Sequence, residues 1–135
     1  MLIDIDPESE VPLYQQLRDR VVEAIAGGRL RPGEQLASVR QLASQFGINI
    51  ATVGKGVELL RQEGLVRTTR RSGSIVSRGP DTSVPRADFA PGWTARLRTV
   101  LAEAVAQGMP ETDIDRISAD LLAEFRRQRN EGLSS

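Results

Sequence analysis

The sequence predicts a mostly helical protein with a small β wing, in which a three-helix N-terminal part is followed by a C-terminal pair of helices. Three observations lead to this fold class. Apolar residues recur at helical spacing in five separate stretches. Two short strand-like runs, separated by a turn, follow the third of these stretches. A segment rich in turn-forming residues and without apolar periodicity precedes the fourth stretch.

The first helix has clear start and stop signals. Pro12 fits a first helical position, and the pair Gly27-Gly28 ends the helix. Residues 31–34, Arg-Pro-Gly-Glu, then have the pattern of a type II turn, and Leu30 and Leu36 flank it. We therefore expect a tiny hairpin between the first and second helices.

The next two helices are predicted to form a helix-turn-helix. The Ser38 hydroxyl can accept a hydrogen bond from the backbone N–H of Gln41, and the Gln41 side chain can reach back, which makes a capping box. Gly47 ends this second helix. Asn49 can then cap a third helix, which is predicted from about residue 50 to residue 63.

A β-hairpin is predicted directly after the third helix. Residues 65–68 and 74–76 are typical of strands, and residues 69–73 join them. A hairpin in this position is a wing. We therefore predict a winged helix-turn-helix over residues 1–78.

The C-terminal part is predicted to dimerise. Residues 79–90 are expected to be a linker, and residues 91–135 to form two amphipathic helices. Two isolated helices of this size cannot cover both of their apolar faces, so a copy related by a two-fold axis is expected to cover them. The predicted dimer contacts are Trp93, Leu97, Val100, Leu101, Ala104, Ile114, Ile117, Leu121, Leu122 and Phe125.

Composition excludes several classes of function. The sequence contains no Cys and no His, which removes disulfides, most transition-metal sites and the commonest general base. The acidic residues Asp113, Asp115 and Asp120 lack the ordered spacing of metal ligands. We therefore predict no enzymatic activity, no metal and no cofactor. No stretch has the length and apolarity of a membrane span, and the acidic N-terminus is not typical of a signal peptide, so we expect a cytoplasmic protein.

Positive charge is concentrated in one region. The formal net charge of the chain is zero, but residues 36–78 hold seven basic residues and two acidic ones. This region contains the predicted helix-turn-helix and wing. The distribution indicates a nucleic-acid partner more clearly than the net charge does.

Residues 12–76 resemble the DNA-binding domain of the GntR family of bacterial regulators. The matching stretches are Pro12–Leu17, Ile25–Leu36, Ser38–Ala43, Thr52-Val53 and Leu59–Val66. The short helical C-terminal part resembles that of the YtrA-type subfamily, in which a helical hairpin serves to dimerise. The chain departs from the family at Ala37, where Pro is usual, and at Ile50 and Gly54, where many members carry an Arg that reads bases.

Five residues of the helix-turn-helix are candidates for DNA contact. By position the third helix is the recognition helix, and Asn49, Thr52 and Lys55 can face the major groove. Asn49 has the alternative role of a cap alone. The resemblance implies that Arg40 contacts DNA, and Ser38 can bind a phosphate in addition to capping its helix. The two glycines of the third helix, Gly54 and Gly56, either let the backbone approach DNA or let the second helix pack closely.

The wing tip adds Arg70, Arg71 and Gly73 to the candidates. Two charges beside a flexible glycine can reach a minor groove, where narrow A·T stretches attract arginine. An exposed turn that only maintains solubility is the alternative interpretation.

These observations predict a sequence-specific transcriptional regulator. The resemblance implies a repressor that binds a palindromic DNA operator as a homodimer. The alternative is a winged helix that binds proteins and not DNA, although such a module has no need for the basic charge around the recognition helix and wing. A small-molecule effector is left open, and its site would be at the dimer helices or between the two parts.

Overall fold

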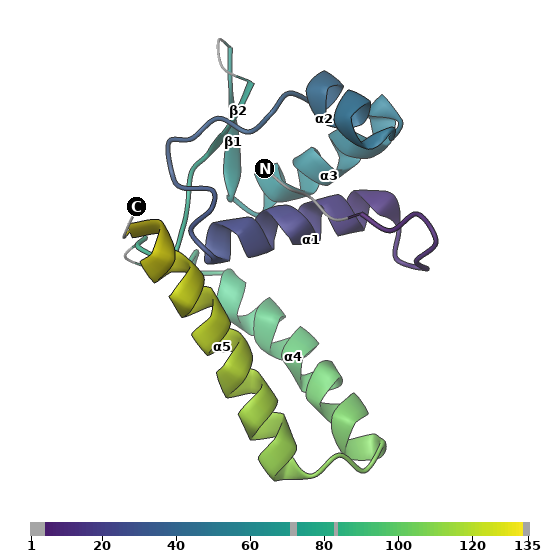
Figure 1. Ribbon diagram of the computed structural model, residues 1–135, viewed down its shortest axis with the longest axis vertical. Helices are drawn as coiled ribbons and strands as arrows, with labels where there is room; N and C mark the ends of the chain where they lie inside the picture. Colours follow the sequence, from purple (N-terminus) through teal and green to yellow (C-terminus); the bar gives the residue numbers. More distant parts are fainter. Residues whose placement is uncertain (1–4, 71–72, 83, 134–135) are drawn as a thin grey trace.

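The computed structural model describes residues 5–70, 73–82 and 84–133. Its elements are α1 Leu13–Ala26, α2 Val39–Phe46, α3 Ile50–Gln62, β1 Val66–Thr69, β2 Gly73–Val76, α4 Phe89–Ala106 and α5 Glu111–Leu133. The first three helices and the two strands form one body, from which α4 and α5 extend as an antiparallel hairpin (Figure 1). The mostly helical fold with a small β wing is thereby confirmed.

Among the described residues, the buried hydrophobic core lies in the N-terminal body. Its buried residues come from α1, α2, α3, both strands and the α1–α2 connection. The largest fully buried side chains are Leu17, Leu36, Leu42, Leu60, Val21, Val53, Val66 and Val76. By contrast, α4 contributes no buried residue. The winged body therefore has a core of its own, and the hairpin does not.

The segment between α1 and α2 pairs with the wing and not with itself. The type II turn is present: Glu34 N donates to Arg31 O at 3.0 Å, and Gly33 has a φ of +92°, which favours glycine. The predicted hairpin around this turn is wrong. Instead, Gln35 forms an isolated antiparallel bridge with Ile75 of β2. The segment thus covers the edge of β2 that β1 leaves open.

Two element boundaries differ from the prediction. Pro12 is the N-cap residue, and α1 begins one residue later at Leu13. The helix α4 begins at Phe89, inside the segment predicted as a linker. Pro91 lies in the first turn of α4, where the backbone N–H that proline lacks has no intrahelical partner. The predicted linker, residues 79–90, therefore extends into the first turn of α4.

The end of α5 returns to the end of α1 (Figure 1). Arg129 Nη1 donates to the carbonyl oxygen of Ala26 at 3.0 Å, so a cation caps the C-terminus of α1. A Cβ built on Gly28 would lie 3.3 Å from Arg129 Cα, and Gly28 has a φ of +74°. The glycine pair that ends α1 therefore also provides the surface on which α5 packs.

Gly56 allows α3 to pack tightly against α1. A Cβ at Gly56 would lie 2.9 Å from Tyr14 O and 3.1 Å from Leu17 Cδ2, and Gly56 is buried. The close approach is to α1, and not to α2 or DNA as expected. A Cβ at Gly54, two residues earlier in the same helix, would meet nothing within 4 Å.

These two glycines give a matched pair of stability predictions. We expect Gly54→Ala to raise the free energy of unfolding by up to about 1 kcal/mol, because alanine is the better helix former. Gly56→Ala should lower it by roughly 1–3 kcal/mol, because the added methyl overpacks the α1–α3 contact. Urea unfolding followed by circular dichroism measures both. Equal effects of the two substitutions would contradict the tight packing at Gly56.

Candidate nucleic-acid interface

The first turn of α2 presents Arg40 to solvent. The Ser38 hydroxyl accepts from Gln41 N at 3.1 Å, and Gln41 Oε1 accepts from Ser38 N at 2.9 Å. The predicted capping box is confirmed. It fixes the start of the helix, and the exposed Arg40 follows two residues after the cap. Arg40 forms no ion pair within the described residues, so its guanidinium remains available to a partner.

The start of α3 combines one polar cap with an apolar surface. Asn49 Oδ1 accepts from Ala51 N at 2.7 Å, so its role as a cap is confirmed. Thr52 is half-buried. Ile50 is 51% exposed at the first position of the helix. The sequence marked Ile50 only as a departure from the arginine of many family members, yet an exposed apolar side chain at this position can contact the methyl group of thymine.

Lys55 is exposed, but it does not extend freely into solvent. Its Nζ lies 3.9 Å from the centroid of the Tyr14 ring, a cation–π contact across α3 and α1. Ala51 and Leu59 lie four positions away in α3, and Lys55 forms no ion pair within the described residues. The contact with Tyr14 lies 41 positions away in the sequence and gave no local signal. It orients the ammonium group and leaves its charge uncompensated.

The wing is a short antiparallel hairpin with basic side chains. Val66 pairs with Val76, and Thr69 pairs with Gly73 at the tip. Arg67 on β1 and Arg70 after it are both exposed. Arg71, which was also predicted to contact DNA, lies outside the described residues. Gly73 is exposed, with a φ of +69°.

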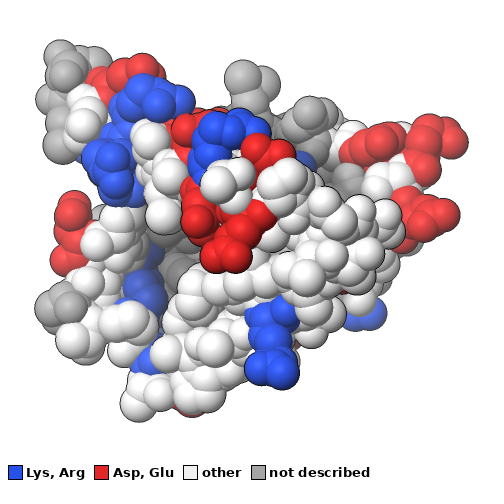
Figure 2. All heavy atoms as spheres, turned by 90° about the horizontal axis from the view of Figure 1, so that it is seen from below, with Lys and Arg blue, Asp and Glu red and all other residues white. Residues whose placement is uncertain are grey.

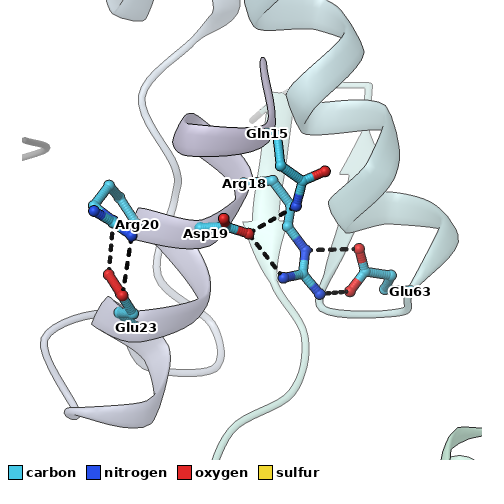
Figure 3. Close-up of polar contacts among 6 residues, drawn as sticks. All are labelled: Gln15, Arg18, Asp19, Arg20, Glu23 and Glu63. Atoms are coloured by element: carbon cyan, nitrogen blue, oxygen red, sulfur yellow. Dashed lines mark hydrogen bonds and ion pairs between the residues drawn. The ribbon is translucent and has the colours of Figure 1, made fainter. Parts of the chain in front are cut away.

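The two acidic residues of this region are both held by arginines. Glu58 accepts hydrogen bonds from Arg61, and these bonds lower the pKa of the Glu58 carboxyl below its ordinary value. Glu63 binds the Arg18 guanidinium through two contacts (Figure 3), and this hydrogen bonding raises the pKa of Arg18. Both carboxylates are thus neutralised by a neighbouring cation.

The basic groups and the hairpin lie on different sides of the molecule. The helix α1 lies between them, with α2, α3 and the wing on one side and the α4–α5 hairpin on the other (Figure 1). Arg40, Lys55, Arg67 and Arg70 form no ion pair within the described residues. The described structure therefore carries uncompensated cations on α2, α3 and the wing, and the two acidic residues of this region are paired with arginines.

The hairpin exposes much of its apolar surface. Among the predicted dimer contacts, Leu97, Ala104, Ile114 and Phe125 are half-buried in the single chain. The others are exposed: Trp93, Val100, Leu101, Ile117, Leu121 and Leu122. Figure 2, which views the hairpin end of the molecule, shows broad uncharged areas between separate patches of acidic and basic side chains. An exposed apolar surface of this kind is typical of a protein interface.

Two further features are absent from the described parts of the chain. No helix there combines the length and apolarity that crossing a membrane requires. No group of three or more acidic side chains there is arranged to hold a metal ion.

Comparison with known proteins identifies the family. Residues 13–76 match the family described as bacterial regulatory proteins, gntR family. The HTH-type transcriptional regulator Rv1152 of Mycobacterium tuberculosis is 32% identical over 96 residues, which cover 71% of this chain and 79% of that protein. This chain belongs to the GntR family. The HTH-type transcriptional repressor YtrA of Bacillus subtilis is 36% identical over 83 residues, or 62% of this chain. The alignment spans 64% of the YtrA repressor.

Solved structures support the GntR assignment along most of the chain. YtrA from Sulfolobus acidocaldarius, described as a GntR-family transcription factor, has a TM-score of 0.61 and 35% identity, covering 78% of this chain and 99% of that one. A transcriptional antiterminator from Listeria monocytogenes has a TM-score of 0.81 at 22% identity, covering 90% and 93%. That second likeness shows the fold alone. The AraR DNA-binding domain, solved in complex with its operator ORX1, has a TM-score of 0.50 and 25% identity, covering 57% and 95%.

Proposed function

We propose that this GntR-family chain is a sequence-specific transcriptional repressor that binds a palindromic DNA operator as a homodimer. The observation that carries the proposal is the set of uncompensated cations on α2, α3 and the wing, namely Arg40, Lys55, Arg67 and Arg70. A phosphate backbone is the partner for which such a set is suited. No catalytic activity, metal or cofactor is part of the proposal.

The relatives support both the partner and the direction of regulation. The YtrA relative from Bacillus subtilis is described as a repressor, and the AraR domain was solved with an operator bound. A regulator that covers promoter DNA blocks access to it, which is the simplest mode of action for a chain of this size.

Within the interface, we propose two kinds of contact. Arg40, Lys55 and Ser38 bind phosphates, and Arg70, Arg71 and Gly73 bring the wing to the minor groove. The side chains at the start of α3 contact the bases. The Asn49 carbonyl already serves as the cap, so its amide nitrogen and the Thr52 hydroxyl are the remaining polar groups. Ile50 recognises a thymine methyl group, in place of the arginine–guanine contact of many family members.

The homodimer is proposed from the exposed apolar surface of the hairpin. Leu121 and Leu122 on α5 are 51% and 64% exposed, and Val100 on α4 is 57% exposed. Two hairpins related by a two-fold axis would cover these side chains in a four-helix layer. The chain would then consist of a winged helix-turn-helix over residues 1–78, a connection, and a dimerisation hairpin formed by α4 and α5.

A winged helix that binds proteins and not DNA is the alternative function. It would bury its recognition surface against a partner, and charged residues are depleted at the centre of protein interfaces. The exposed Ile50 suits this alternative. The surrounding unpaired cations favour DNA.

Selection of bound duplexes from random DNA tests the proposed function. We expect an enriched motif with two inverted half-sites whose centres lie about 34 Å, or one helical turn, apart. Six phosphate contacts per dimer would give a log–log salt slope on the order of −5, measured by fluorescence anisotropy of the selected duplex. Failure to enrich any motif, or an affinity that does not depend on salt, would overturn the proposal.

A further inference from the structure

A hollow of about 590 Å³ lies where the winged body meets the hairpin. The side chains of Val22 and Ile25 on α1 line one wall, and those of Phe89 and Trp93 on α4 line another. Leu65, just before β1, adds to the apolar lining. Phe89 and Trp93 are 47% and 46% exposed, so their rings are open to a molecule in the hollow. Its size is typical of sites for small organic molecules.

The charged lining of this hollow is strongly cationic. It consists of Arg18, Arg78, Arg86, Arg96 and Glu63. Arg18 is paired with Glu63, and Arg86 is paired with Asp88. Arg78 donates to the carbonyl oxygen of Val84. Within the described residues Arg96 forms no hydrogen bond, and neither arginine has an acidic partner. The hollow therefore carries two uncompensated positive charges beside an apolar lining.

We propose that this hollow is a binding site for a small amphipathic organic anion, a carboxylate with an aliphatic or aromatic body. The carboxylate would bind the guanidinium groups of Arg96 and Arg78, which match its planar geometry. The body would pack on Phe89, Trp93 and Ile25, where removal of apolar surface from water supplies affinity.

Charge and shape distinguish this occupant from others. An organic cation would face two unpaired arginines, and a neutral apolar molecule would desolvate them without a compensating hydrogen bond. An inorganic anion would leave the aromatic rings exposed. A second copy of the chain is a further occupant that the experiment below separates, because Trp93 is also among the predicted dimer contacts.

The site joins the two functional parts of the chain. One wall belongs to α1, which packs on α3, and the other belongs to the first turns of α4. A bound anion would therefore fix the angle between the winged body and the hairpin, which sets the distance between two recognition helices in a dimer. This consequence rests on the proposed function, whereas binding of the anion does not.

Fluorescence of Trp93, the single tryptophan of the chain, reports binding directly and without DNA. The probes are octanoate, octanol and octylammonium, which share an apolar body and differ in charge. At fixed protein concentration we expect octanoate to shift the emission saturably with a Kd below about 1 mM. Octanol and octylammonium should bind at least tenfold more weakly.

Two arginines of α4 provide the matched variants. Arg96→Gln should weaken octanoate binding about tenfold, because a charge-assisted hydrogen bond is lost, and Arg96→Lys should recover part of it. Arg98→Gln, two residues along the same helix and outside the hollow, should leave the affinity unchanged. Circular dichroism checks that each variant is folded.

Three outcomes would overturn the anion site. The three probes could bind equally, which would show a merely apolar surface. Arg98→Gln could weaken octanoate as much as Arg96→Gln does, which would show general attraction by net charge. The emission could follow the monomer–dimer equilibrium and ignore octanoate, which would show that a second copy fills the hollow. Each outcome leaves the test of operator binding unaffected.

Discussion

We expect Leu121→Asp to convert the protein to a monomer and to weaken binding to a two-half-site operator by two or more orders of magnitude. Leu121 is 51% exposed on α5 and belongs to the apolar surface that a second hairpin would cover. A carboxylate there would be buried without a partner in the dimer, which is costly. Once the dimer is lost, the second half-site is no longer bound at a high effective concentration, which is worth a factor of 10²–10⁴.

The measurement combines sedimentation equilibrium with anisotropy on two DNA fragments. The variant should sediment as a monomer, lose affinity for the full operator and keep its affinity for a single half-site. Ala119→Asp is the control, because Ala119 is exposed and lies about 200° around the helix from Leu121. A parent that is monomeric at tens of micromolar, or equal loss in both variants, would refute the dimer.

A truncation after Gly79 tests independently whether the hairpin forms the dimer. All buried core residues lie between Leu17 and Val76, so the winged body should fold without the hairpin. It loses the contact of Arg129 with the end of α1, which should cost little because it is one partly exposed hydrogen bond. We expect a folded monomer that binds a half-site like Leu121→Asp. A truncated form that remains dimeric would give the hairpin another role.

Local signals predicted the helices, their caps and the wing, because these depend on neighbouring residues. The capping box of Ser38 and Gln41 and the cap at Asn49 are confirmed, since side chain and backbone partners lie within three positions. The strands Val66–Thr69 and Gly73–Val76 lie within about one residue of their predicted bounds. The helical start at Phe89 was missed because the segment before residue 91 is rich in turn-forming residues and lacks apolar periodicity.

Contacts between distant segments could not be predicted in the same way. The bridge from Gln35 to Ile75, the ring contact of Lys55 with Tyr14 and the packing of Arg129 on Gly28 each join segments 40 or more positions apart. No periodicity or motif in either segment indicates which distant segment it contacts. Tertiary packing alone decides these contacts, and the proposed anion site arises from the same kind of juxtaposition.

Simultaneous replacement of Arg40 and Arg70 by alanine should have the second largest effect, a roughly hundredfold to thousandfold loss of operator affinity. Each phosphate contact contributes about 0.9 to the log–log salt slope. In a dimer the two substitutions remove four contacts, so a parent slope on the order of −5 should fall to about −2. At 0.15 M salt this difference corresponds to between two and three orders of magnitude, and the two affinities should converge near 1 M salt.

Stability should be almost unchanged, because both side chains are exposed and Arg40 and Arg70 form no ion pair within the described residues. Anisotropy titrations over about one decade of salt, from roughly 0.05 M to 0.5 M, measure the salt slopes of the parent and the variant. The control is Arg98→Ala with Arg126→Ala, which removes the same net charge from exposed positions of α4 and α5. If the control lowers the salt slope as much as the Arg40 and Arg70 variant does, the protein attracts DNA through its overall electrostatic field. If the Arg40 and Arg70 variant keeps the parent slope, α2 and the wing are not the DNA-binding surface. A fall in slope confined to the Arg40 and Arg70 variant would place the phosphate contacts on the start of α2 and the wing tip, because position and not total charge would then decide the affinity.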